Sequence, residues 1–83
     1  MKEKNFDRCY KELLELAISY HKDRITIKLA DDIIKPYLKD LTISEKYELI
    51  NYVNSQFKKN YSGAYKLYEK SEIDNHYYIE YVG

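Results

Sequence analysis

A few residues of this 83-residue chain belong to types that catalyse reactions or bind metals in other proteins. Asp31 and Asp32 are adjacent carboxylates, but neighbouring residues of a helix point about 100° apart, so the two cannot share a proton as a facing pair does. We expect them to stabilise a helix N-terminus instead. His21, His76 and the single cysteine, Cys9, show no ligand pair at a spacing typical of zinc sites. The sequence therefore predicts no catalytic residue and no metal site.

Cofactor binding and redox chemistry also lack support in the sequence. Glycine occurs only at Gly63 and Gly83, so there is no glycine-rich loop to hold the phosphates of a nucleotide. Cys9 falls in an apolar helical stripe, where a small buried thiol fits, and a lone cysteine forms no internal disulfide. We expect no cofactor, and we expect a protein that binds a partner rather than an enzyme.

Tyrosine is the residue type that stands out in the composition. The chain contains eleven tyrosines, two phenylalanines and no tryptophan. A tyrosine ring is a large apolar body with one polar tip, which suits the edge of a core or a surface that contacts a partner. The core of so short a chain cannot enclose all of these rings, so some must stay accessible. AT-rich coding would also raise the tyrosine count and would indicate a low-GC bacterium, a phage or a plasmid, but it does not determine where the rings lie.

Formal charge is balanced, with fourteen basic and fourteen acidic residues. No basic stripe marks a nucleic-acid surface, and no acidic stripe marks a mimic of DNA. The N-terminal residues lack the apolar stretch of a signal peptide, and no run is long enough to cross a bilayer. We therefore expect a cytoplasmic protein with no membrane partner.

The first half of the chain predicts a helix, a strand and a second helix. Apolar residues at alternating spacings of four and three predict a helix over residues 5–22, with Asn5 as its cap. The period-two alternation of residues 25–29 predicts a short strand. A second helix is expected either to begin near Asp31 or Asp32, so that Pro36 falls in its first turn, where a missing backbone donor is tolerated, or to kink at Pro36, and we favour the first option.

A third helix is predicted by Thr42 and Glu45, which have the spacing of a capping box. The apolar face of this helix consists of Ile43, Tyr47, Ile50, Val53 and Phe57. Tyr52 falls on the opposite face. It is the tyrosine that we most expect to be exposed.

The last part of the chain predicts a β-hairpin. Residues 76–82 are rich in β-branched and aromatic residues, and the polar residues 71–75 would form the loop before them. Residues 64–70 fit either the first strand of the hairpin or a short helix. If both segments are strands, the side chains that point away from the core are Lys66, Tyr68, His76 and Tyr78.

These elements predict an α+β fold in one domain over residues 1–83: a three-helix core with a small C-terminal antiparallel β-hairpin, which the short strand at 25–29 can join. This order of elements resembles that of a winged helix. The resemblance implies that residues 44–59 are a recognition helix that lies in the major groove of DNA. The exposed face of that helix, however, carries mixed charges, and the hairpin is net acidic.

We expect a small non-enzymatic protein-binding module that acts through an exposed tyrosine-rich surface. Its size and AT-rich composition suit an inhibitor or regulator of a host protein, for example a defence nuclease, encoded by a phage or mobile element. The candidate partner-binding residues are Tyr52, Tyr68, Tyr78, Tyr61, Lys66 and His76. Two alternatives remain, namely a winged-helix-like DNA-binding transcriptional regulator and a homodimer that forms through the edge of the hairpin.

Overall fold

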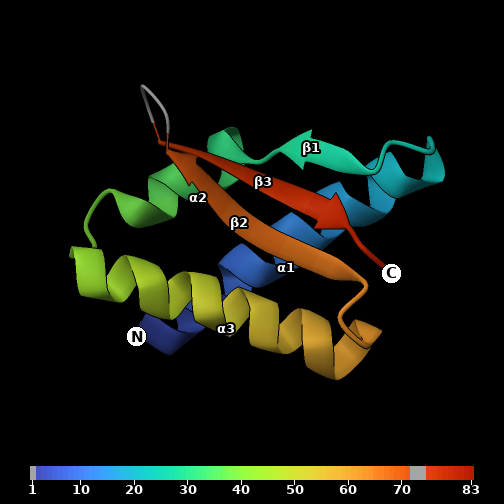
Figure 1. Ribbon diagram of the computed structural model, residues 1–83. Helices are drawn as coiled ribbons and strands as arrows, with labels where there is room; N and C mark the ends of the chain where they lie inside the picture. Colours follow the sequence, from blue (N-terminus) through green and yellow to red (C-terminus); the bar gives the residue numbers. More distant parts are fainter. Residues whose placement is uncertain (1, 72–74) are drawn as a thin grey trace.

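The computed structural model of the protein describes residues 2–71 and 75–83. Its elements are α1 (Lys2–Lys22), β1 (Ile27–Leu29), α2 (Asp31–Leu38), α3 (Ile43–Tyr61), β2 (Tyr65–Ser71) and β3 (Asn75–Tyr81). The three strands form an antiparallel sheet in the order β1-β3-β2, and the helices lie against one of its faces (Figure 1). The predicted α+β class is confirmed, as are the three helices, the C-terminal hairpin and the short strand that joins it.

The first helix, α1, is amphipathic and supplies much of the core. Its buried residues are Phe6, Cys9, Tyr10, Leu13 and Ala17. The helix begins at Lys2, so Asn5 lies inside it and the prediction that Asn5 is the cap is wrong. Lysine and glutamate are good helix formers, which allows the helix to extend before Asn5.

The second helix, α2, is short and begins at Asp31, as expected. Pro36 is the sixth residue of this helix, so the prediction that it lies in the first turn is wrong. The N–H that Pro36 lacks would donate to the carbonyl oxygen of Asp32, so the cost is one helical hydrogen bond, and Asp32 is exposed in the first turn of the helix. Ile34 is fully buried and packs α2 against the core.

The third helix, α3, begins with the predicted capping box. The N–H of Glu45 donates to Thr42 Oγ1 at 3.2 Å, and the N–H of Thr42 donates to the Glu45 carboxylate at 3.0 Å. The buried residues of α3 are Leu49, Ile50, Val53 and Phe57. Ile43 is 74% exposed and Tyr47 is 49% exposed, so the predicted apolar face is wrong at these two positions. The buried face includes Leu49 instead, because α3 packs against α1 as well as β2.

The ambiguous segment 64–70 forms strand β2 from Tyr65 onward. The pairing of β2 with β3 runs from Tyr65 opposite Tyr81 to Ser71 opposite Asn75. Ser71 and Asn75 of the predicted loop are therefore strand residues, and the rest of that loop lies outside the described residues. The hairpin side chains that point towards the helices are Tyr65, Leu67, Glu69, Tyr77, Ile79 and Tyr81.

The outer edge of β2 is covered by α3. Asn54 Nδ2 donates to the carbonyl oxygen of Leu67 at 2.8 Å, and the N–H of Leu67 donates to Asn54 Oδ1, also at 2.8 Å. A side-chain amide thus takes the place of a neighbouring strand at the middle of β2. This bridge fixes the position of α3 along the hairpin.

Asn54→Ala should lower the free energy of unfolding by about 1–3 kcal/mol, because it leaves the amide and the carbonyl of Leu67 without partners in a largely buried place. Urea denaturation followed by circular dichroism measures the change. Asn51→Ala is the matched control, because Asn51 is exposed on the same helix. Equal losses in the two variants would show that the bridge contributes nothing.

Candidate functional site

One face of the sheet points away from the helices and carries exposed or half-buried side chains. We term it the open face, and its residues are Ile27, Leu29, Lys66, Tyr68, Lys70, His76, Tyr78 and Glu80. These side chains alternate along each strand with those that enter the core or face the helices. The described helices lie on the other side of the sheet (Figure 1). The predicted outward direction of Lys66, Tyr68, His76 and Tyr78 is therefore confirmed.

Two tyrosines form the centre of the open face. Tyr68 and Tyr78 are cross-strand partners, and their rings stack with centroids 5.8 Å apart and planes inclined by 26°. On the other side of Tyr78, its partner in β1 is Leu29, which is 45% exposed. A row of apolar surface thus crosses the sheet from β1 to β2.

The contribution of β1 to this surface could not be recognised from the sequence alone. The alternation of the apolar residues Ile27 and Leu29 is visible in the sequence, and the structure shows that both are exposed. The signal has no meaning, however, until the pairing of β1 with β3 shows which face each residue joins.

Polar side chains surround the apolar row. In the register of the sheet, Lys66 lies opposite Glu80, and Lys70 lies opposite His76. The two lysines also flank Tyr68 along β2. Among the residues that define the open face, Glu80 is the one acidic side chain, so the face carries a net positive charge.

Asp31, the first residue of α2, holds His76 at the margin of the open face. Asp31 Oδ1 accepts a hydrogen bond from the N–H of Tyr77 at 2.7 Å, and Asp31 Oδ2 lies 2.7 Å from His76 Nδ1. Lys35 Nζ lies 3.4 Å from the same oxygen. Burial alone would raise the pKa of Asp31, but the hydrogen bonds from His76 and Tyr77, together with the charge of Lys35, lower it below its ordinary value. An ionised carboxylate only accepts hydrogen bonds, so His76 Nδ1 is the donor.

A second carboxylate, Glu69, lies on the inner side of β2. It accepts hydrogen bonds from Lys46 Nζ at 2.9 Å, from the Tyr77 hydroxyl at 2.9 Å and from the Tyr47 hydroxyl at 3.4 Å. Burial alone would raise the pKa of Glu69, but the hydrogen bonds from Lys46 and Tyr77 lower it. These contacts attach the start of α3 to the hairpin, and we assign them a structural role.

Tyr52 does not belong to the open face, and the prediction that it is exposed is wrong. Its ring is half-buried against Phe6, with ring centroids 5.9 Å apart, and its hydroxyl donates to Asp7 Oδ1 at 3.2 Å. The reason is that α1 packs against the side of α3 that the helical wheel assigned to solvent.

Tyr61 also lies apart from the open face. It is 37% exposed at the end of α3, and its ring meets the edge of Tyr65 with centroids 5.7 Å apart. Tyr65 belongs to the inner side of the sheet, where Phe57, Tyr81 and His21 also contact it. Tyr61 therefore covers the end of the core.

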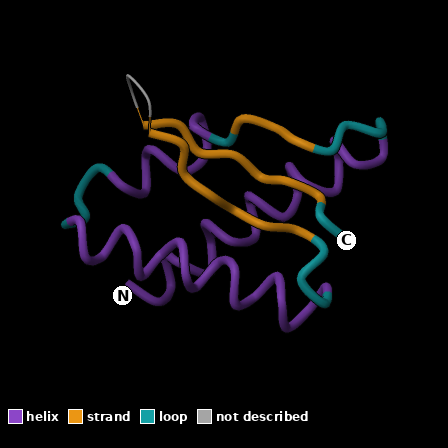
Figure 2. Tube along the Cα trace, viewed as in Figure 1, coloured by secondary structure: helices purple, strands orange, loops and turns teal. Residues whose placement is uncertain are grey.

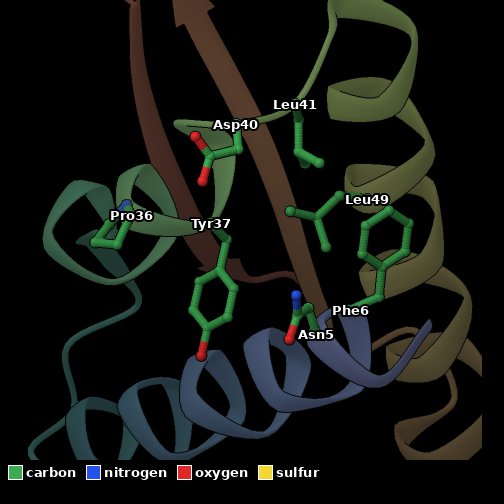
Figure 3. A pocket seen from close by; sticks show the side chains of 7 residues that line it. All are labelled: Asn5, Phe6, Pro36, Tyr37, Asp40, Leu41 and Leu49. Atoms are coloured by element: carbon green, nitrogen blue, oxygen red, sulfur yellow. The ribbon is translucent and has the colours of Figure 1, made fainter. Parts of the chain in front are cut away.

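A buried thiol and a cavity are the other features that could take part in a reaction or bind a ligand. Cys9 is completely buried, and this burial together with the nearby Glu12 raises its pKa to about 12, so the thiol stays protonated at neutral pH. A cavity of about 180 Å³ is lined by Asn5, Phe6, Pro36, Tyr37, Asp40, Leu41 and Leu49 (Figure 3). The Tyr37 hydroxyl at this cavity is already bonded to Glu12. Within residues 2–71 and 75–83, no group of three or more His, Cys, Asp and Glu side chains could hold a metal ion.

Tyr52→Ser should lower the free energy of unfolding by about 2–4 kcal/mol, because the ring that packs on Phe6 and the hydrogen bond to Asp7 are both lost. Tyr52→Phe keeps the ring and should cost only about 0.5–1.5 kcal/mol. Urea denaturation compares the two variants with Ile43→Ser, which changes a side chain of the same helix that is 74% exposed. Wild-type stability in Tyr52→Ser would return Tyr52 to the set of candidate surface residues.

Acid should destabilise the protein through Asp31 and Glu69. Folding lowers the pKa of both carboxyls below their ordinary values of about 4, so the stabilisation they provide is complete above that pH and is lost as the pH falls through the lowered folded values. For the wild type, the urea concentration at the unfolding midpoint should be lower at about pH 2.5 than at about pH 6. Asp31→Asn should have a lower midpoint than the wild type at about pH 6, and its midpoint should decrease less between the two pH values. Asp32→Asn, at the exposed neighbouring position, is the control. If the urea midpoint of Asp31→Asn decreased between the two pH values as much as that of the wild type, ionised Asp31 would not be a source of the stability lost in acid.

Comparison of the chain with protein-family models, curated proteins and solved structures found no match. None of the described helices is long and apolar enough to cross a membrane. The open face brings together four of the candidate residues, namely Lys66, Tyr68, His76 and Tyr78.

Proposed function

We propose that this protein is a small non-enzymatic module that binds another protein through the open face of its sheet. The observation that carries the proposal is the stacked pair of Tyr68 and Tyr78 on a face that none of the described helices covers. Tyrosine supplies a large contact area with few rotatable bonds to immobilise, and it is enriched among the residues that dominate binding energy.

The strands hold both rings in place before a partner arrives. Tyr78 lies on β3, which is paired with a strand on each side. The neighbours of the two tyrosines along the hairpin include Leu67, Tyr77 and Ile79, which are buried in the core. The backbone beneath the rings is therefore anchored, and this anchoring lowers the entropy cost of binding.

Charge indicates the chemistry of the partner. Lys66 and Lys70 flank Tyr68, and Glu80 offsets only part of their charge. A complementary protein surface would present apolar or aromatic side chains at its centre and carboxylates around them. The partner class is therefore a protein with an acidic rim around an apolar patch.

On this proposal the chain acts in the cytoplasm as an inhibitor or regulator of a host protein, for example a defence nuclease. Its amino-acid composition, which suits AT-rich coding, is consistent with a phage or mobile element as its source. The groove in which a nuclease binds nucleic acid is basic, because it must attract phosphates. The positively charged open face would therefore contact such a nuclease at an acidic surface outside its groove.

Replacing Tyr68 and Tyr78 together with serine should abolish partner capture, because the centre of the open face loses both rings. Affinity capture from the host followed by mass spectrometry identifies the partner, and calorimetry should then show at least about a 100-fold loss of affinity. The free energy of unfolding should fall by about 1–2 kcal/mol, because two half-buried rings lose their cross-strand contact and serine favours a strand less than tyrosine does.

Tyr47→Ser is the matched control, because Tyr47 is 49% exposed but lies on α3 rather than on the open face. It should capture the partner as the wild type does. Unchanged capture by the double variant, or an equal loss in Tyr47→Ser, would contradict the proposal. Lys66→Glu should slow association with an acidic partner and weaken its dependence on salt.

The second candidate is a winged-helix-like DNA-binding regulator, which the pairing of β1 with the hairpin favours. In that reading the exposed face of α3 would enter the major groove. Its exposed polar residues include Glu48, Asn51, Ser55, Lys58 and Lys59, so its charge is mixed. Retention of the protein on duplex DNA at about 50 mM salt, falling steeply as salt rises, would favour this candidate over protein binding.

A further inference from the structure

The two outer edges of the sheet differ. On β2, Asn54 occupies the amide and the carbonyl of Leu67 at the middle of the strand. Along the outer edge of β1, Figure 2 shows no other segment among the described residues. The edge that remains open for strand pairing is therefore that of β1, and not the hairpin edge considered from the sequence.

The backbone groups of this edge are available for pairing. Thr26 O accepts a hydrogen bond from the N–H of Tyr81, and the N–H of Ala30 donates to Tyr77 O, both at 2.7 Å. Antiparallel pairing directs the groups of alternate residues to opposite sides of a strand. The N–H and C=O of Ile27, between these two contacts, therefore point away from β3.

Apolar side chains accompany these backbone groups. Ile25, Ile27 and Leu29 are 41%, 44% and 45% exposed. By the same alternation, the N–H of Leu29 and the C=O of Ile25 point outward, whereas the N–H of Ile25 is bonded to Tyr20 O at 2.9 Å. A partner strand would satisfy the outward groups and cover the three side chains.

We propose that the β1 edge pairs antiparallel with the β1 edge of a second copy of this chain, around a two-fold axis at Ile27. In this register the two Ile27 residues exchange both of their hydrogen bonds, and the N–H of each Leu29 donates to the C=O of Ile25 in the other copy. The apolar residues then line up across the interface. Lys28 lies opposite Thr26, whereas an axis at Lys28 would place two lysines directly opposite each other, which is unfavourable.

Charges at the two ends of β1 are complementary. Residues 22–24 carry a net charge of +1, and Asp32 is exposed just beyond the other end of the strand. Antiparallel pairing places the basic end of one copy beside the acidic end of the other, and the two-fold axis repeats the contact. This complementarity favours a second copy over an unrelated strand as the occupant of the edge.

The dimer would have a direct consequence for the open face. A two-fold axis perpendicular to the sheet keeps both open faces on the same side, so the two tyrosine pairs would share one continuous sheet. The dimer itself does not depend on the proposed function, because it uses the edge of β1 rather than the rings of Tyr68 and Tyr78. Self-association and partner capture can therefore fail separately.

Sedimentation equilibrium over a concentration series tests the pairing. The wild type should pass from a 10.1 kDa monomer to a particle of twice that mass as the concentration rises. Ile27→Pro should weaken the dimer at least about tenfold, because each copy loses an outward donor while the bonds of Thr26 and Ala30 to β3 remain. Ile43→Lys, at a position 74% exposed on α3, is the matched control and should keep the wild-type dissociation constant.

Charge reversal tests the antiparallel orientation of the two copies. Arg24→Glu and Asp32→Arg should each weaken the dimer, and the combined variant should restore it. Circular dichroism checks that each variant folds, and Ile27→Lys replaces Ile27→Pro if the proline variant does not. A chain that stays monomeric up to about 1 mM, or a dimer that survives substitution of Ile27, overturns the proposal. If the chain stayed monomeric, the candidate that remained for pairing with the β1 edge would be an extended segment of another protein.

Discussion

The structure depends on a hairpin that enters the core with one face only. Along β3, Tyr77 and Ile79 are buried, so the intervening Tyr78 must point to the opposite side, because side chains alternate along a strand. The same holds on β2, where Leu67 is buried and Tyr68 points outward. The alternation that builds the core therefore also creates the open face, since the described helices lie against only one side of the sheet.

Two polar side chains specify how the helices sit on this sheet. Asp31 joins α2 to β3 through the N–H of Tyr77, and Asn54 joins α3 to β2 through both backbone groups of Leu67. Buried polar groups are costly unless they are paired, so these contacts favour one arrangement of helices over other packings of the same apolar residues. They also determine which surfaces stay available, because Asn54 occupies the middle of the β2 edge, whereas no described strand pairs with the outer edge of β1.

The tyrosines divide into those that complete the fold and those that lie on the open face, where we propose that a partner binds. Tyr52 and Tyr61 cover the margins of the core through contacts with other rings. Tyr68 and Tyr78 contact each other on the open face instead. Composition alone does not separate the two groups, because both consist of amphipathic rings in strands or helices. The separation comes from which side of each element another element covers.

The sequence by itself determined the features whose signals are local: the amphipathic period of α1, the capping box of α3 and the alternation of residues 76–82. It also predicted the outward direction of Tyr68 and Tyr78, which follows from alternation once the strands exist. Only the tertiary structure decided that segment 64–70 is a strand and that Tyr52 is covered. It also decided which strand keeps an open edge. These outcomes depend on contacts between residues far apart in the chain, such as the hydrogen bond from Tyr52 to Asp7, and a local pattern carries no information about them.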